Sequence, residues 1–182
     1  DALAQRIEGG EQIIVAPVGR DVEIQFPINE VISYYKQHSG SLSVVNTLSF
    51  KIPVELITND YSIAPPANLL LVQSDKKEKF FLDNELANNE TSFYASYNST
   101  DKCYIFSGMR NYLLKMLEKS SIEPTDYTFT LTPVTVVTES NTSNSYYGQT
   151  TQYVSSIDPY IGAPVMVKLD LDKAEINLTF AK

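Results

Sequence analysis

Residues 48–56 read Leu48-Ser49-Phe50-Lys51-Ile52-Pro53-Val54-Glu55-Leu56, in which apolar side chains occupy every second position. A period of two is that of a β-strand with one face buried and the other in solvent. The alternation therefore predicts a long strand over 48–58. Pro53 cannot donate a ladder hydrogen bond, so we expect it at a sheet edge or at a bulge.

Similar short runs occur on both sides of this stretch, separated by Gly, Pro, Asn and Ser. Residues 91–97 and 103–106 are expected to form a hairpin across Asn98–Asp101. Residues 165–169 and 176–180 are expected to form a closing pair across the turn 170–173. Residues 140–156 are interpreted as a polar loop with one strand over 150–154. The remaining strands are predicted at 12–15, 21–26, 69–72 and 127–137.

Helical periodicity is limited to two places. Asn29 can cap a short helix that ends at Ser39-Gly40. A second helix, capped by Ser107, carries apolar residues at i, i+3, i+4, i+7 and i+8, namely Met109, Tyr112, Leu113, Met116 and Leu117. Since strands do not alternate with helices, the chain is predicted to be a mainly β, antiparallel β-sandwich or jelly roll with one or two short helices. Its 182 residues suit a single domain over 1–182.

The net charge of −8 disfavours polyanionic partners, so no nucleic acid is expected to bind. The densest basic stretch, Lys76–Lys79, is interpreted as a solvated turn followed by Phe80-Phe81-Leu82. The single cysteine, Cys103, excludes an internal disulfide and is expected to be buried and inert.

Catalytic patterns are missing from the sequence, and we expect no catalytic residue and no enzyme activity. The only histidine, His38, falls near the end of a polar helix, where we expect it at the surface. No Gly-x-Ser-x-Gly elbow and no phosphate-binding glycine loop occur. Carboxylates that could cleave a glycosidic bond are scattered without a telling context.

The richest group of oxygen ligands is Asp83-Asn84-Glu85, which is followed by Asn88-Asn89-Glu90. Calcium needs only oxygen ligands, so a calcium site here is one interpretation and a solvated turn is the other. No other cofactor is expected.

One segment suggests a binding surface. Residues 144–153 combine Tyr146, Tyr147 and Tyr153 with Ser, Asn, Gln and Gly. Tyrosine supplies rigid amphipathic contact area, and the small polar residues supply adaptable hydrogen bonds. The three tyrosines are therefore candidate ligand-binding residues for a sugar or a protein; in the alternative interpretation they half-bury against the sheet.

Three stretches resemble a known family: residues 80–84 with 91–97, residues 104–113, and residues 165–180. Together they look like the C-terminal half of an uncharacterised lipoprotein family of Bacteroidetes envelopes. Residues 46–58 and 65–72 are similar in layout to jelly-roll modules of extracellular carbohydrate-active proteins. The absence of Trp departs from many sugar-binding modules of that kind.

The resemblance implies export to the outer membrane or cell surface, with a lipid-modified cysteine upstream of Asp1 as the only membrane anchor. It implies no known activity. We therefore expect a non-enzymatic cell-envelope lipoprotein domain with an interaction or structural role. A carbohydrate-binding module that uses the Tyr-rich loop is the alternative. An envelope protein or a glycan is the expected partner, and the oligomeric state is left open.

Overall fold

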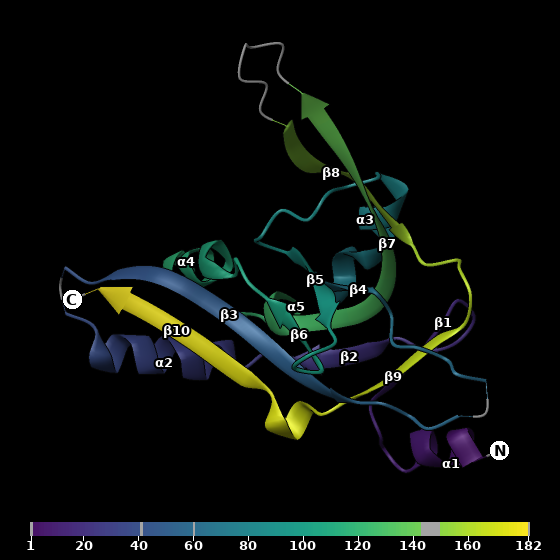
Figure 1. The fold of residues 1–182 in the computed structure, drawn as a ribbon. Helices are drawn as coiled ribbons and strands as arrows, with labels where there is room; N and C mark the ends of the chain where they lie inside the picture. The colour runs from purple at the N-terminus through teal and green to yellow at the C-terminus, as the bar shows by residue number, and fades with distance from the viewer. Residues whose placement is uncertain (1, 41, 60, 143–149, 182) are drawn as a thin grey trace.

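The structure is a computed structural model that describes residues 2–40, 42–59, 61–142 and 150–181 (Figure 1). The elements in chain order are α1 (Ala2–Glu8), β1 (Ile13–Ala16), β2 (Val22–Gln25), α2 (Ile28–His38), β3 (Val44–Glu55), β4 (Asn68–Gln73), the 3-10 turn η1 (Ser74–Lys76), α3 (Lys77–Leu82), β5 (Ser92–Asn98), β6 (Cys103–Phe106), α4 (Arg110–Glu118), α5 (Pro124–Tyr127), β7 (Thr128–Thr142), β8 (Thr150–Pro159), β9 (Val165–Leu169), η2 (Leu171–Lys173) and β10 (Glu175–Ala181).

The ten strands of the described residues belong to one antiparallel sheet with the order β1-β9-β3-β6-β5-β4-β7-β2, to which β10 adds beside β3 and β8 beside β7. The sheet curls strongly. Phe26, directly after β2, meets Phe50 of β3 edge-on at 5.4 Å between ring centroids, although four strands separate β2 from β3 in the sheet order. The predicted class is therefore confirmed: the fold is mainly antiparallel β and is consistent with a sandwich, whose facing layers are two parts of one curled sheet.

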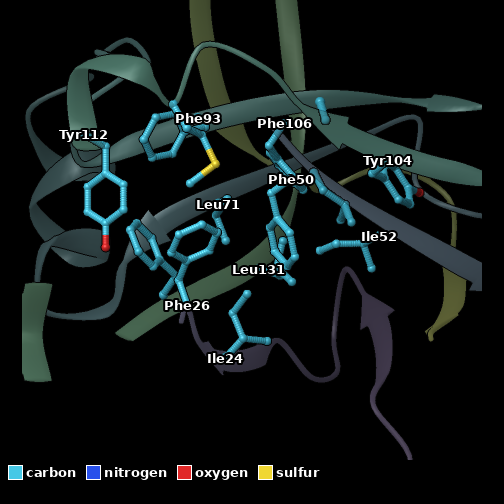
Figure 2. Packing of buried hydrophobic residues seen from close by; sticks show 14 of the residues in the cluster. Ile24, Phe26, Phe50, Ile52, Leu71, Phe93, Tyr104, Phe106, Tyr112 and Leu131 are labelled. Carbon is cyan, nitrogen blue, oxygen red and sulfur yellow. The ribbon is translucent and has the colours of Figure 1, made fainter. Parts of the chain in front are cut away.

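One large core fills the curled sheet (Figure 2). Figure 2 shows the rings of Phe26 and Phe50 close together inside it, and Leu131 belongs to the same core. Helices α2 and α4 cover this core with their buried faces, Ile28, Val31 and Ile32 from α2 and Tyr112, Leu113 and Met116 from α4. Both helices were predicted, but the caps predicted for them were wrong: Pro27 and Met109, not Asn29 and Ser107, precede the two helices. The further short helices α1, α3 and α5 were not predicted, because four to seven residues hold too little periodicity to see.

The expected solvated turn over Lys76–Lys79 is in fact helical, in η1 and α3. Helix α3 places Phe80 over a second, smaller core on the other face of the sheet, formed with Leu70, Val72, Val134 and Ile157. This apolar contact stabilises the helix. The helical turn at the same time leaves the charged residues around Phe80 in solvent.

Strand β3 has neighbours along both edges, so of the two interpretations of Pro53, a sheet edge or a bulge, the sheet edge was wrong. On one edge β3 pairs with β6; on the other it pairs first with β10 and then with β9. Pro53 lies where the second partner changes, and its carbonyl accepts a hydrogen bond from the Asp170 backbone at 2.9 Å. A residue without an N–H is tolerated there because the strand partner is interrupted at that point.

The expected closing pair of residues 165–169 with 176–180 was also wrong. Strands β9 and β10 both pair with β3, not with each other, in the described part of the chain. The turn 170–173 forms η2, which carries the chain onward along the same edge of β3 instead of back upon β9.

Candidate functional site

A long β-hairpin, β7 with β8, projects from the body of the molecule at the top of Figure 1. Pairing runs from Val134 opposite Pro159 to Thr142 opposite Thr150. Residues 140–142, which we expected in a loop, belong to β7, and the strand expected over 150–154 lies within β8; residues 143–149 lie outside the described residues.

The inner part of this hairpin is anchored and the outer part is not. Val134 and Ile157 are buried in the second core beneath α3. Beyond the register shift between Val137 and Thr138, residues 138–141 and 150–153 are exposed on both faces of the ribbon. We call this outer part, residues 138–142 with 150–153, the arm.

Of the three tyrosines selected from the sequence, the structure describes one. Tyr153 lies on the arm, is 48% exposed, and donates a hydrogen bond from Oη to Oε2 of Glu139 across the strand pair, at 2.9 Å. This hydrogen bond raises the pKa of the Tyr153 phenol. Tyr146 and Tyr147 lie outside the described residues. Glu139 was not selected from the sequence, because only the register of β7 with β8 brings it beside the tyrosine.

Two of the three candidate calcium ligands lie near a lysine. Nζ of Lys79 lies 3.7 Å from Oδ2 of Asp83 and 3.9 Å from Oε1 of Glu85, so an ammonium group already faces both carboxylates. Asn84 adopts a left-handed backbone with φ 52° at the end of α3. Within the described ranges, no three His, Cys, Asp or Glu side chains converge as metal ligands. Calcium binding at Asp83, Asn84 and Glu85 stays a prediction.

Two other residues lie where the sequence placed them. His38 is exposed at the end of α2; its ring stacks on Tyr34 at 4.1 Å, and Nδ1 lies 2.8 Å from the Tyr34 carbonyl. Cys103 is buried in β6, and burial raises the pKa of its thiol. A protonated, enclosed thiol is a poor nucleophile.

The structure also forms a charged hollow of about 600 Å³ that sequence reasoning missed, between residues 9–12, Glu55 and residues 168–173. Arg6 binds Glu11 at 2.7 Å, and Lys168 lies 2.8 Å from Glu55 and 3.7 Å from Glu11. The hydrogen bond from Arg6 lowers the pKa of Glu11, and the hydrogen bond to Glu55 raises the pKa of Lys168. Both shifts favour the charged forms, so these groups are matched ion pairs and not poised acids or bases.

A second hollow, about 480 Å³, separates α2 from β10. Its helical wall is a stripe of α2 with the residue before it, and its other wall is four consecutive residues of β10. We call it the α2–β10 groove. Its residues are Pro27, Glu30, Val31, Tyr34, Ile176, Asn177, Leu178 and Thr179.

Comparison with known proteins finds no family model, no curated protein and no solved structure that matches this chain. In the part of the chain that the structure describes, no helix is both long enough and apolar enough to span a membrane.

Proposed function

We propose that this chain is a non-enzymatic interaction domain of an exported cell-envelope lipoprotein, and that the arm is its contact with another envelope protein. The single observation that carries the proposal is the arm itself, a ribbon whose two faces both lie in solvent. A two-stranded ribbon without a covered face is at best marginally stable in water, so contact with a second protein would bury surface that this domain leaves open.

Site-specific photo-crosslinking in cells that make the full-length lipoprotein tests this proposal. A crosslinking residue at Ser140 or at Gln152, both exposed on the arm, should yield one adduct with an envelope protein. The same residue at Ser121, which is exposed between α4 and α5, is the control and should yield none. Equal crosslinking from all three positions, or none from the arm, would refute the role of the arm.

Metabolic labelling with an alkyne-bearing fatty acid tests the lipoprotein part separately. The full-length protein should carry the label on the cysteine upstream of Asp1 and should fractionate with the outer membrane. An unlabelled protein that fractionates elsewhere would contradict the assignment to the cell envelope. The role of the arm would still be decided by the crosslinking experiment.

Glycan binding is the second candidate, and the pair formed by Tyr153 and Glu139 favours it. An exposed ring beside a carboxylate offers a stacking face and a hydrogen-bond acceptor within one short patch. On a glycan array, Tyr153→Ala should abolish any signal, whereas Tyr61→Ala, at an 85% exposed tyrosine away from the arm, should retain it. An array without signal for the unaltered chain would exclude this candidate.

A further inference from the structure

The outer edge of β10 is open. Strand β10 pairs with β3 on one side only, and no other described strand adds to its second edge. Exposed strand edges present unpaired N–H and C=O groups, and an extended backbone is the structure that pairs with such a row.

The register identifies which groups of β10 face outward. On β3, Leu48 and Val54 bond away from β10, since the Leu48 carbonyl accepts from Met109 and the Val54 N–H donates to Lys102. Because strand residues alternate in direction, the odd-numbered residues of β3 face β10. Their partners are Glu175, Asn177 and Thr179, so Ile176 and Leu178 point their backbone N–H and C=O to the open edge.

That open edge borders the α2–β10 groove. Four consecutive residues of β10 line the groove, and α2 runs along its other side, as seen at the left of Figure 1. Tyr35 of α2 meets Phe180 of β10 edge-on at 5.3 Å, which fixes the spacing of the two walls at one end. The groove therefore combines a row of backbone groups with an apolar helical wall formed by Val31 and Tyr34, the latter 53% exposed.

We infer that the α2–β10 groove binds an extended peptide segment of a partner protein, added as a strand to β10, with an apolar side chain against Tyr34 and a Lys or Arg beside Glu30. Glu30 is the one charged residue that lines the groove, and no cation of the described chain pairs with it. A basic side chain on the incoming segment complements this carboxylate and the net charge of −8.

A second copy of the chain fits the groove less well. The sequence of β10 is Glu175-Ile176-Asn177-Leu178-Thr179-Phe180-Ala181, which itself contains no cation to pair with Glu30 and adds a carboxylate, and each copy has a net charge of −8. Pairing of two β10 strands would thus place like charges together, and like charges across an interface oppose association. The site differs from the arm in place and in chemistry, so this inference goes beyond the proposed function and does not depend on it.

The probe for the test is a set of capped seven-residue peptides in which Val and Thr alternate, with Lys at each position in turn and with Glu at the same positions as matched controls. Binding to the chain is measured by fluorescence polarisation, and the bound site by hydrogen exchange. We expect at least one Lys peptide to bind about tenfold more tightly than its Glu counterpart, a difference typical of one charged contact. The amides of Ile176 and Leu178 should become protected.

Two further comparisons separate strand addition from other binding modes. N-methylation of the peptide backbone at alternate positions should abolish binding, whereas N-methylation at the intervening positions should leave it unchanged, because only one edge of an added strand faces β10. Glu30→Gln should bring the Lys and Glu peptides to similar affinity, and Tyr34→Ala should weaken both. Tyr61→Ala, away from the groove, is the control and should weaken neither.

Absence of binding by every Lys peptide, or protection on an element other than β10, would overturn the inference. So would equal loss from both N-methylation patterns. A variant with the arm removed should bind the peptides as the unaltered chain does. Peptide binding without crosslinks from the arm, or crosslinks without peptide binding, therefore shows which of the two proposals has failed.

Discussion

Tyr112 joins the large core to a buried backbone carbonyl. Its ring meets those of Phe26, Phe93 and Phe129 edge-on, with centroids 5.8, 6.3 and 5.5 Å away. Its hydroxyl donates to the Asp126 carbonyl at 3.0 Å, which also accepts from the Gln73 side chain at 3.0 Å. Burial raises the pKa of this phenol, which keeps it protonated as a donor.

Two variants of Tyr112 should separate these contributions. Tyr112→Phe keeps the ring but removes one of the two hydrogen-bond donors to the Asp126 carbonyl. The free energy of unfolding should therefore fall by about 1 kcal/mol. Tyr112→Ala also opens a cavity among the rings and should cost about 3–5 kcal/mol. Urea denaturation measures both values. Similar costs for the two variants would mean that the hydrogen bond, not ring packing, dominates at this position.

Asp126 should make stability depend on pH. Burial favours its neutral form, but hydrogen bonds from Nζ of Lys119 at 2.7 Å and from the Glu123 backbone at 2.9 Å outweigh burial, and its pKa is lowered. A lowered pKa means that the stabilisation is full above the unfolded value of about 3.9 and is lost as pH falls through the folded value.

Asp126→Asn should therefore cost about 1–2 kcal/mol of unfolding free energy near pH 7. The difference between the variant and the unaltered chain should shrink as pH falls below about 3.9, since the carboxyl becomes neutral in both states. Urea titrations over this range compare the two proteins directly, so the other carboxyl groups cancel. A difference that stays constant with pH would show that Asp126 acts by shape and not by charge.

At the scale of elements, the sequence predicted strands well, but it predicted pairing only for the local hairpin of β5 with β6. The alternation in 21–26, 48–58 and 69–72 is local, and each of these runs overlaps a strand, β2, β3 and β4. Which strands pair depends on residues far apart in the chain, such as Ile13 opposite Lys168. No local pattern shows that η2 would place β10 beside β3, or that Phe80 would fold the charged Lys77–Leu82 into a helix.

The arm illustrates the same limit for the candidate site. Tyr153 could be selected from composition, but its partner Glu139 follows only from the register of β7 with β8. The α2–β10 groove has no signature in the sequence, because its walls lie about 140 residues apart and each wall reads as an ordinary helix or strand.

Removal of the arm should leave the body of the domain intact. Thr138 lies opposite Val154, so replacing residues 139–153 by Asn-Gly closes the hairpin with a two-residue turn. Since the described side chains that are lost, those of residues 139–141 and 150–153, are exposed, the free energy of unfolding should change by no more than about 1 kcal/mol. Thermal and urea denaturation measure this change. A much larger loss would show that the arm contributes to folding and would disqualify the variant as a control in the peptide experiment.

At the scale of the whole molecule, the two ends of the sheet share one interior. Ile14 of β1 and Val22 and Ile24 of β2 belong to the same core as Val54 of β3 and Val167 of β9. A core built from strands at both ends of the chain cannot lose one part without exposing the rest, so we expect a single cooperative unfolding transition.

Cys103 provides a probe of that transition, because it is the only cysteine and its side chain is completely buried. It lies in β6 opposite Pro53 of β3 and Asn98 of β5, near the middle of the sheet order. Pulsed labelling of the thiol across a urea gradient should give the same midpoint as far-UV circular dichroism and tyrosine fluorescence, since reagent reaches the sulfur only when the sheet opens. Labelling that begins at lower urea than the loss of circular dichroism would mean that the strands around β6 open alone. The domain would then unfold as two cooperative units in spite of its shared core.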